Sequence, residues 1–450
     1  MSGIAEIFLS QGHAVSGSDL GNSETTERLV RMGAVIQVGH SKDNVTDVDV
    51  VVISSAVKAD NPEVLAAKAL GIPVIPRAEM LAEIMRGKKG IAIAGTHGKT
   101  TTTSMTAQIL MKAGLDPTVV VGGKVEAIGS NAKMGAGNVV VVEADESDGS
   151  FHLLPATHAV VTNIDLDHME YYGTRENLNE AFLTFTKKIP FYGRIMLCGD
   201  DAGINEILSQ VTKPHLTYGF GEHNDLIAKN PRMANGFQCF ELWTREHRNE
   251  KHELQGEVEL AVLGLHNILN ALGAIGISLS MGASIHAIKE ALREFKHVRR
   301  RFDERYFSPT TGIRIIDDYG HHPTEIRAVL ATARQTAHPR IVTVFQPHRY
   351  TRTQLCWNEF LTCFAEADHV VILPIYAASE EPIAGVDSAT LAKAIRDTLG
   401  QKTQISEAAS LEDAVEWVKK NRLSGDLILT MGAGSITKLP DLIVKQLGLN

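Results

Sequence analysis

A strand, a glycine-rich bend and a helix follow one another in the segment that most constrains the fold of this chain. The apolar run over residues 90–94 predicts a buried strand. Gly95 and Gly98 form the bend, and the pattern after them predicts a helix to about Ala113, with Gly114 as its stop. This order is typical of a phosphate-binding loop, because glycines let backbone amides close around phosphate oxygens and the helix N-terminus adds partial positive charge.

Lys99 and Thr100 stand at the start of that helix. In a phosphate-binding loop the lysine reaches the β- and γ-phosphates, and the hydroxyl binds Mg²⁺. The strict Walker spacing requires a glycine at the position of Ile93, so the motif departs from the pattern by one residue. The alternative is an ordinary strand-to-helix turn with a chance lysine. The surrounding strand and helix favour nucleotide binding.

Acidic clusters follow two further apolar runs. Residues 138–143 predict a strand buried on both faces and lead into the cluster over 143–148, while the strand over 159–164 leads into 165–168. In a parallel sheet these strand ends share one edge with the phosphate loop. Each cluster alone fits a solvated loop, but together they favour a site for Mg²⁺, which prefers oxygen ligands. We expect Glu143 and His168 to lie nearest the metal.

Two asparagines and an arginine cluster are further candidates for nucleotide contacts. Asn267 and Asn270, three residues apart on an apolar helix, share one face. Their amides suit either the edge of a purine or the capping of the helix start, and the spacing leaves both open. The basic run over 299–301 is either a solvated face or a clamp for phosphate.

The C-terminal third reads as a third α/β unit. The predicted strands cover residues 313–317, 340–345, 370–374 and 426–430. The first two lead into polar segments rich in histidine and arginine. The bend over 432–436 lacks the third glycine and the acidic residue of a dinucleotide-binding turn, so we interpret it as a tight turn without a ligand.

The N-terminal third also alternates helices and strands, which predicts a doubly wound parallel sheet. The predicted elements are a helix over 1–12, a strand over 14–19, a helix over 25–32, strands over 35–38 and 48–54, a helix over 62–70 and a strand over 72–75. Such a sheet normally begins with a strand and a glycine-rich turn, whereas this sequence opens within the helix. For residues 214–259, which show little helical pattern, we expect peripheral strands.

Composition sets limits on the partners. The 44 basic and 53 acidic residues among 450 give a net charge of −9, which disfavours non-specific binding to nucleic acid or to an anionic membrane. The longest apolar region, residues 260–283, is interrupted by His266, Asn267 and Asn270, so no membrane span is expected. The four cysteines lack metal-ligand spacing, which fits a reducing, cytoplasmic setting.

Taken together, these stretches resemble the Mur ligases of bacterial peptidoglycan synthesis, in family order and over nearly the whole chain. The matching stretches are residues 16–19, 95–100, 143–148, 167–169, 264–271, 300–303, 317–323 and 345–353. The resemblance implies an α/β protein of three domains: a Rossmann-like domain for a UDP-sugar over 1–88, truncated at its start, a central P-loop ATPase-like domain over 89–298, and a C-terminal Rossmann-like domain over 299–450.

The resemblance also implies roles for individual residues. The implied catalytic residues are Lys99, Glu143, His168, Arg301 and His348. Those implied to bind ATP are Gly95, Thr96, His97, Gly98, Lys99, Thr100, Thr101, Asn267, Asn270, Arg301 and Asp318. Thr100, Glu143 and His168 would hold Mg²⁺, and Asp19, Ser54, Asn131, His321, Arg349 and Arg352 would bind substrate.

Within the family the sequence is most similar to members that join L-alanine to the lactyl carboxylate of UDP-N-acetylmuramate through an acyl phosphate, at the expense of ATP. Two alternatives stay open. One is the related ligase that adds a recycled tripeptide to the same UDP-sugar. The other is an inactive nucleotide-binding protein, which the absent first strand and glycine-rich turn would suggest.

Overall fold

The computed structural model describes residues 1–54, 56–125, 130–245, 250–296 and 298–447. Contacts divide the chain into two units, of which the first comprises Met1–Ala261 and Asn267–Lys296. The second comprises Val262–His266 and His297–Asn450.

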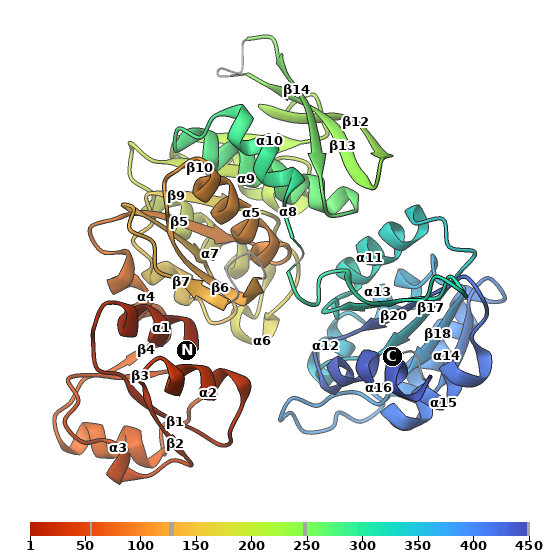
Figure 1. Ribbon diagram of the computed structural model, residues 1–450, viewed down its shortest axis with the longest axis horizontal. Helices are drawn as coiled ribbons and strands as arrows, with labels where there is room; N and C mark the ends of the chain where they lie inside the picture. Colours follow the sequence, from red (N-terminus) through yellow and green to blue (C-terminus); the bar gives the residue numbers. More distant parts are fainter. Residues whose placement is uncertain (55, 126–129, 246–249, 297, 448–450) are drawn as a thin grey trace. The chain divides into compact units, whose positions relative to one another are not determined.

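A ten-stranded sheet forms the centre of the first unit (Figure 1). In spatial order its strands are β14 (Glu253–Leu260), β13 (Phe237–Thr244), β12 (Leu226–Ala234), β11 (His215–Gly219), β10 (Arg194–Cys198), β9 (His158–Val161), β5 (Lys89–Ala94), β8 (Val139–Glu143), β6 (Thr118–Val125) and β7 (Ser130–Lys133). The pairs from β12 to β6 are parallel, and β13, β14 and β7 pair antiparallel. The strands predicted within 214–259 are therefore confirmed as one edge of this sheet.

Helices alternate with the strands of the first unit. They are α1 (Ser2–Ser10), α2 (Glu24–Arg31), α3 (Pro62–Ala69), α4 (Arg77–Met85), α5 (Lys99–Lys112), α6 (Met169–Tyr172), α7 (Arg175–Lys188), α8 (Ala202–Ile207), α9 (Leu265–Ser280) and α10 (Ile285–Arg293). Among these described helices, α9 alone has its first two residues, Leu265 and His266, in the second unit. The valines of β8 are buried because the strand is covered on both faces. α10 packs on α5, where Gln108 donates a hydrogen bond to the Ala291 carbonyl at 2.8 Å.

The N-terminal segment has the predicted order of elements but pairs its strands differently from a continuous sheet. β1 (Ser16–Asp19) pairs in parallel with β2 (Val35–Val38), and β3 (Val51–Ile53) pairs in parallel with β4 (Val74–Pro76). Among the described residues these two pairs form separate sheets. The expectation of one doubly wound sheet over this segment therefore needs correction, because no hydrogen-bonded ladder in the described chain joins β1 to β3.

The second unit is a doubly wound sheet. In spatial order its strands are β15 (Asp303–Phe307), β16 (Arg314–Asp318), β20 (Asp426–Met431), β17 (Arg340–Phe345), β18 (His369–Ile372) and β19 (Gln404–Glu407). Among the described strands of this unit, β15 alone is antiparallel to its neighbour. The helices are α11 (Pro323–Gln335), α12 (Tyr350–Leu355), α13 (Trp357–Cys363), α14 (Ser388–Leu399), α15 (Leu411–Asn421) and α16 (Leu439–Gln446).

Apolar cores lie on both faces of that second sheet. One core joins the sheet to α11, α13 and α14, and the other joins it to α15 and α16. The bend after β20 is a close-packed turn, since a Cβ on Gly432 would lie 2.7 Å from the Gln346 carbonyl oxygen and one on Gly434 would lie 2.5 Å from Tyr376 Cγ. Packing therefore explains both glycines, as the sequence predicted.

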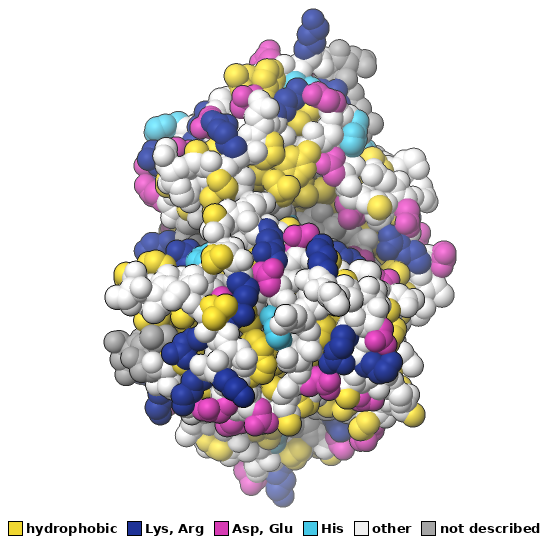
Figure 2. Space-filling model, turned by 90° about the vertical axis from the view of Figure 1, so that its right-hand side faces the viewer, with side chains coloured by type: hydrophobic (Ala, Val, Ile, Leu, Met, Phe, Trp, Pro, Cys, Tyr) yellow, Lys and Arg dark blue, Asp and Glu magenta, His cyan; other side chains and the backbone are white. Residues whose placement is uncertain are grey.

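Charged side chains of both signs share one face of the molecule. On the face drawn in Figure 2, lysine and arginine side chains are interspersed with acidic ones. In the described part of the chain, no helix is both long and apolar enough to cross a membrane.

Candidate functional site

The loop between β5 and α5 has the backbone conformation expected of a phosphate-binding loop. Gly95 (φ 123°) and Gly98 (φ 81°) both have positive φ. A Cβ on Gly95 would lie 2.1 Å from Thr162 Oγ1, and a Cβ on Gly98 would lie 2.3 Å from Asn270 Oδ1. Glycine is therefore required at both positions. The bend leads directly into the 14-residue helix α5, whose N-terminal N–H groups favour an anion.

Side chains that follow β9 hold this loop in place. Asn163 Oδ1 accepts a hydrogen bond from the His97 backbone N–H at 2.8 Å, and Asn163 Nδ2 donates to the His97 carbonyl at 3.0 Å. Thr162 Oγ1 donates to the same carbonyl at 2.6 Å. The loop is thus fixed by its neighbouring strand as well as by its own glycines.

Lys99 turns back onto the loop. Its Nζ donates to the carbonyl oxygens of Gly95 (2.7 Å) and Thr96 (3.0 Å), and it lies 2.9 and 2.8 Å from the two carboxylate oxygens of Glu146. Burial alone would lower the pKa of Lys99, but the carboxylates of Glu146 and Glu143 raise it. Lys99 is therefore a cation held at the phosphate loop.

Thr100 and Glu143 meet beside that lysine. Thr100 Oγ1 donates to the Glu143 carboxylate, at 3.1 and 3.0 Å from its two oxygens. The Gly122 backbone N–H donates to Glu143 Oε2 at 2.8 Å. The hydroxyl and carboxylate that the sequence assigned to one metal site thus lie in contact, on α5 and β8.

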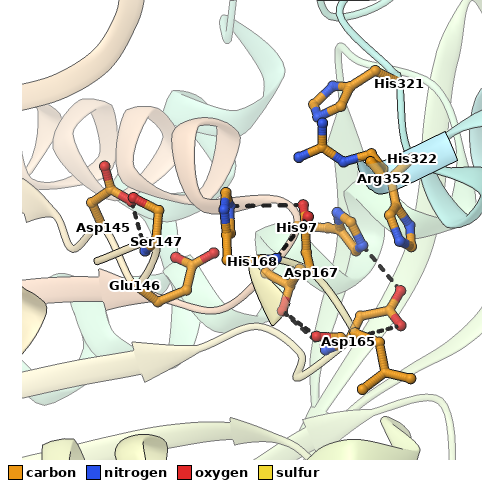
Figure 3. Close-up of polar contacts among 12 residues, drawn as sticks. His97, Asp145, Glu146, Ser147, Asp165, Asp167, His168, His321, His322 and Arg352 are labelled. Atoms are coloured by element: carbon orange, nitrogen blue, oxygen red, sulfur yellow. Dashed lines mark hydrogen bonds and ion pairs between the residues drawn. The ribbon is translucent and has the colours of Figure 1, made fainter. Parts of the chain in front are cut away.

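His168 lies at the start of α6 among carboxylates. It has positive φ (55°), and its ring nitrogens lie 3.7 Å from Asp167 and 3.8 Å from Glu170. Figure 3 shows the His168 ring between Glu146 on one side and Asp167 on the other. Burial raises the pKa of Glu146, whereas for Asp145 the effect of burial is outweighed by hydrogen bonds from Ser147, which lower the pKa of that carboxyl.

The second acidic cluster also meets the phosphate loop. The His97 ring lies 3.1 Å from the Asp165 carboxylate (Figure 3). Thr96 Oγ1 accepts a hydrogen bond from the Asp165 backbone N–H at 2.9 Å. Both predicted clusters therefore converge on the same sheet edge. A hydroxyl and carboxylates beside a lysine are a donor set that fits Mg²⁺ and a polyphosphate.

The two asparagines of α9 lie against the phosphate loop. Asn270 Oδ1 accepts a hydrogen bond from Thr102 Oγ1 at 3.3 Å, and Asn270 Nδ2 donates to Asn267 Oδ1 at 3.1 Å. Both asparagines are buried, as is Thr101 in the first turn of α5. Asn270 therefore supports the loop, which is a contact that neither of the two sequence interpretations included.

A cavity of about 170 Å³ lies between the N-terminal helices and the ten-stranded sheet. Ser2, Glu24, Thr25, Arg28, Gly122 and Asn131 line it. Arg28 pairs with the buried carboxylate of Glu6 and donates to Asn131 Oδ1 at 3.4 Å. Asn131 Nδ2 donates to Ser2 Oγ at 3.1 Å. Because Gly122 also contacts Glu143, the cavity adjoins the candidate metal site.

Asp19 and Ser54, which the sequence also assigned to substrate binding, lie at the ends of two different strands. Asp19 ends β1, is exposed, and accepts a hydrogen bond from the Leu20 backbone N–H at 2.7 Å. Ser54 follows β3 and is half-buried, and its carbonyl accepts from the Val57 N–H at 3.1 Å. Of the three residues assigned to that substrate in this segment, the cavity lining contains only Asn131.

In the second unit, Asp318 ends β16 as a buried carboxyl. Its oxygens accept hydrogen bonds from the backbone N–H groups of Phe302 and Gly320, both at 2.7 Å. Burial raises the pKa of Asp318 to about 6, although the nearby Arg301 guanidinium acts in the opposite direction. The group is thus a fixed hydrogen-bond acceptor whose charge depends on pH near neutrality.

The three arginines of the basic cluster before β15 have different surroundings. Arg300 pairs with the buried Asp317 at 3.0 Å and donates to the Gly432 carbonyl at 2.6 Å, so it is neither a solvated face nor a free clamp. Arg301 lies 3.4 Å from Glu325 and about 5.2 Å from the Tyr319 ring. Arg299 is exposed.

His321, His348 and Arg352 form a cluster at the strand ends of the second unit. The His321 and His348 rings are 5.6 Å apart, and the His348 ring stacks on Tyr376. Arg352 is buried, and its Nη1 lies 3.1 Å from His348 Nδ1. Arg349 has positive φ (68°), and its Nε lies 3.9 Å from Glu380.

Family models match three consecutive parts of the chain. The model of the Mur ligase family catalytic domain matches residues 1–89, that of the Mur ligase middle domain matches 93–278, and that of the Mur ligase glutamate ligase domain matches 300–434. A UDP-N-acetylmuramate–L-alanine ligase of Trichlorobacter lovleyi is 49% identical over 99% of this chain and 96% of its own. The chain belongs to the Mur ligase family.

Other Mur ligases are also similar to this chain over nearly its whole length. A UDP-N-acetylmuramate–L-alanine ligase of Anaeromyxobacter dehalogenans is 50% identical over 97% of this chain and 93% of its own. The solved UDP-N-acetylmuramate-alanine ligase MurC of Thermotoga maritima is 30% identical, with a TM-score of 0.82, and covers 100% of this chain and 96% of its own. A murein peptide ligase of Psychrobacter arcticus shares the fold at 23% identity, with a TM-score of 0.71 over 100% of this chain and 96% of its own.

The structure of this Mur ligase adds residues that the sequence did not single out. Glu146 pairs with Lys99, Asn163 holds the loop, and Arg28 lines the cavity. Glu146 lies just after one predicted strand and Asn163 lies near the end of another strand of the same sheet, so the place of both residues at the sheet edge was readable. Their partners were not, because every partner comes from another segment.

Proposed function

We propose that this Mur ligase catalyses the ATP-dependent joining of L-alanine to the lactyl carboxylate of UDP-N-acetylmuramate, with ADP and phosphate as products. The observation that carries the proposal is the similarity, at about half the positions and over nearly the full length, to ligases named for this substrate and this amino acid. The reaction is a step of peptidoglycan precursor synthesis, and we place it in the cytoplasm.

ATP and Mg²⁺ have a suitable site at the edge of the ten-stranded sheet. The loop over 95–101 would receive the phosphates, with Lys99 donating to them. Thr100, Glu143 and His168 would hold Mg²⁺, because they supply a hydroxyl, a carboxylate and an imidazole in segments that end or follow neighbouring strands of the same sheet. Asn267 and Asn270 would face the adenine, and Arg301 and Asp318 would contact phosphate and ribose.

The chemistry requires a carboxylate to attack a polyanion, so the repulsion between them must be cancelled. In the proposed reaction the lactyl carboxylate attacks the γ-phosphorus and ADP leaves, which gives an acyl phosphate. The amine of L-alanine then attacks the acyl carbon and phosphate leaves. Bound Mg²⁺ supplies positive charge at the phosphoryl oxygens. Lys99 adds charge from the protein, and its fixed position avoids reorganisation during the reaction.

The remaining roles follow from position and charge. Arg349 and Arg352 carry the guanidinium groups that suit the carboxylate of alanine. His348 is held beside Arg352, and His321 lies against His348. For the UDP-sugar we assign Asp19, Ser54 and Asn131, of which Asn131 lies in the cavity that adjoins Glu143.

We propose three functional domains, at residues 1–88, 89–298 and 299–450. The first would bind the UDP-sugar, the second ATP and the third the amino acid. Three assigned residues cross this division: Asn131 of the second domain for the UDP-sugar, and Arg301 and Asp318 of the third domain for ATP.

Product formation with two acceptors tests the proposal. Purified protein is incubated with ATP, Mg²⁺ and UDP-N-acetylmuramate, and either L-alanine or the recycled tripeptide, while phosphate release and the nucleotide-sugar product are measured. We expect product with L-alanine. A Lys99→Ala control should lose about 100-fold or more of the rate.

The two alternatives predict other outcomes of the same experiment. Product with the tripeptide alone would replace the proposal by the recycling ligase. No product with either acceptor, together with no binding of UDP-N-acetylmuramate, would favour the inactive nucleotide-binding protein.

A further inference from the structure

The ammonium group of Lys99 has no donor left over for a nucleotide. A lysine side chain carries three N–H donors and no acceptor. Two of them go to the Gly95 and Thr96 carbonyl oxygens, at 2.7 and 3.0 Å. The third goes to Glu146, whose two carboxylate oxygens lie 2.9 and 2.8 Å from Nζ. Since the first two partners belong to the loop backbone, a phosphate oxygen can take only the donor that Glu146 holds.

The Glu146 side chain is buried, and its backbone is held by a neighbouring helix. Its side chain is 2% exposed, against 15% for that of Lys99. The Tyr172 hydroxyl donates a hydrogen bond to the Glu146 carbonyl, which anchors the backbone at this residue to α6. Burial raises the pKa of Glu146, and the charge of Lys99 lowers it in part. The carboxylate therefore depends on Lys99 as its counterion.

We propose that Glu146 is a positioning residue that competes with a nucleotide phosphate for one N–H donor of Lys99. Glu146 acts through Lys99 and stands in for a phosphate anion at the mouth of the loop. The inference rests on the proposed use of ATP and extends it, because it names a group of this chain that competes with the nucleotide.

Competition of this kind sets the direction of the effect. When a phosphate takes the third donor, the buried carboxylate loses its counterion next to a second anion, and this loss opposes binding. In Glu146→Gln the neutral amide oxygen can still accept a hydrogen bond, but it holds the ammonium more weakly than a charged group does. We expect the Kd of Mg²⁺-ADP to fall about tenfold, equivalent to about 1.4 kcal/mol.

Isothermal titration calorimetry with Mg²⁺-ADP, without sugar or amino acid, measures this effect. Asp148→Asn is the matched control, because Asp148 lies in the same loop and its carboxylate accepts from the Ser150 N–H instead. The control removes one negative charge without touching Lys99, and its Kd should stay within about twofold of that of the unmodified protein. An equal gain in affinity from Asp148→Asn would overturn the inference, because general repulsion would then explain the result.

A second background tests whether the effect passes through Lys99. In Lys99→Met the ammonium is gone, so adding Glu146→Gln should change the Kd by no more than about twofold. An effect that persists in this background, or a Glu146→Gln protein that binds ADP equally well or more weakly, would contradict the inference. Thermal unfolding of each variant checks the fold. If Glu146→Gln does not fold, Glu146→Asp should give a smaller gain of the same sign, and an absent gain there would also overturn the idea.

Failure of this inference differs from failure of the proposed function. If the unmodified protein bound no ADP and made no product, the proposed function itself would be wrong. If it bound ADP and made product while Glu146→Gln left the affinity unchanged, only the role of Glu146 would fall.

Discussion

Substitution of Gly98 by alanine separates the geometry of the phosphate loop from ordinary backbone strain. Gly98 precedes α5 with φ 81°, and Gly114 follows the same helix with φ 78°. A Cβ on Gly98 would lie 2.3 Å from Asn270 Oδ1, whereas a Cβ on Gly114 meets nothing within 4 Å. An alanine would therefore have the same unfavourable φ at both positions, but only at Gly98 would its Cβ also collide with a side chain. Gly114→Ala is therefore the matched control.

The expected magnitudes follow from these contacts. Positive φ costs an alanine about 1–2 kcal/mol at either position. At Gly98 the Asn270 side chain must also move and give up its hydrogen bonds with Thr102 and Asn267, at about 0.5–1.5 kcal/mol each. We therefore expect Gly98→Ala to lower the free energy of unfolding by about 2–5 kcal/mol, and Gly114→Ala by about 1–2 kcal/mol.

Urea unfolding and Mg²⁺-ADP titration of both variants provide the assay. Asn270→Ala removes the obstructing oxygen, so the double variant Gly98→Ala, Asn270→Ala should be less unstable than the sum of the single effects. The affinity for ADP should fall in Gly98→Ala and stay unchanged in Gly114→Ala. Equal loss of stability in the two single variants, or strict additivity with Asn270→Ala, would refute the reasoning.

Three further predictions concern the proposed metal, ribose and alanine sites. Glu143→Gln should raise the Mg²⁺ concentration for half-maximal activity about tenfold or more, because Glu143 is the carboxylate beside Thr100, and an unchanged Mg²⁺ titration would contradict this role. Since burial raises the pKa of Asp318 to about 6, its proton is held more tightly in the folded protein. The stability that neutral Asp318 contributes is then lost as the pH rises through about 6. The affinity for ADP should instead fall as the pH drops through about 6, because the carboxylate that would contact ribose becomes protonated. A Kd that does not depend on pH would contradict the ribose role. Arg352→Lys should raise the KM for L-alanine about tenfold or more and leave the KM for ATP within about twofold, because an ammonium cannot replace a planar guanidinium fork, and equal changes in both KM values would argue against an alanine site.

The elements that the sequence predicted rest on apolar runs and glycine stops, which are local signals, but the inner strands β6 and β10 and the helices α7 and α8 were not predicted. The run over 138–143 predicted β8, and Gly114 marked the end of α5. Edge strands were harder. β15 (Asp303–Phe307) and β19 (Gln404–Glu407) escaped prediction, because an edge strand needs few buried side chains and both sequences are mainly polar.

The sequence by itself determined which groups stand at the ends of the central strands, since a strand run and the residue after it are neighbours in the chain. It thereby placed Lys99, Glu143 and the acidic clusters at one sheet edge. Only the tertiary structure decided how those groups pair. Glu146 accepts from the third donor of Lys99, Asn270 lies against Gly98, and Arg300 pairs with Asp317. The partners in these pairs are up to 172 residues apart in the sequence. Such pairings depend on packing and on the cost of burying an unpaired charge, which no local pattern encodes.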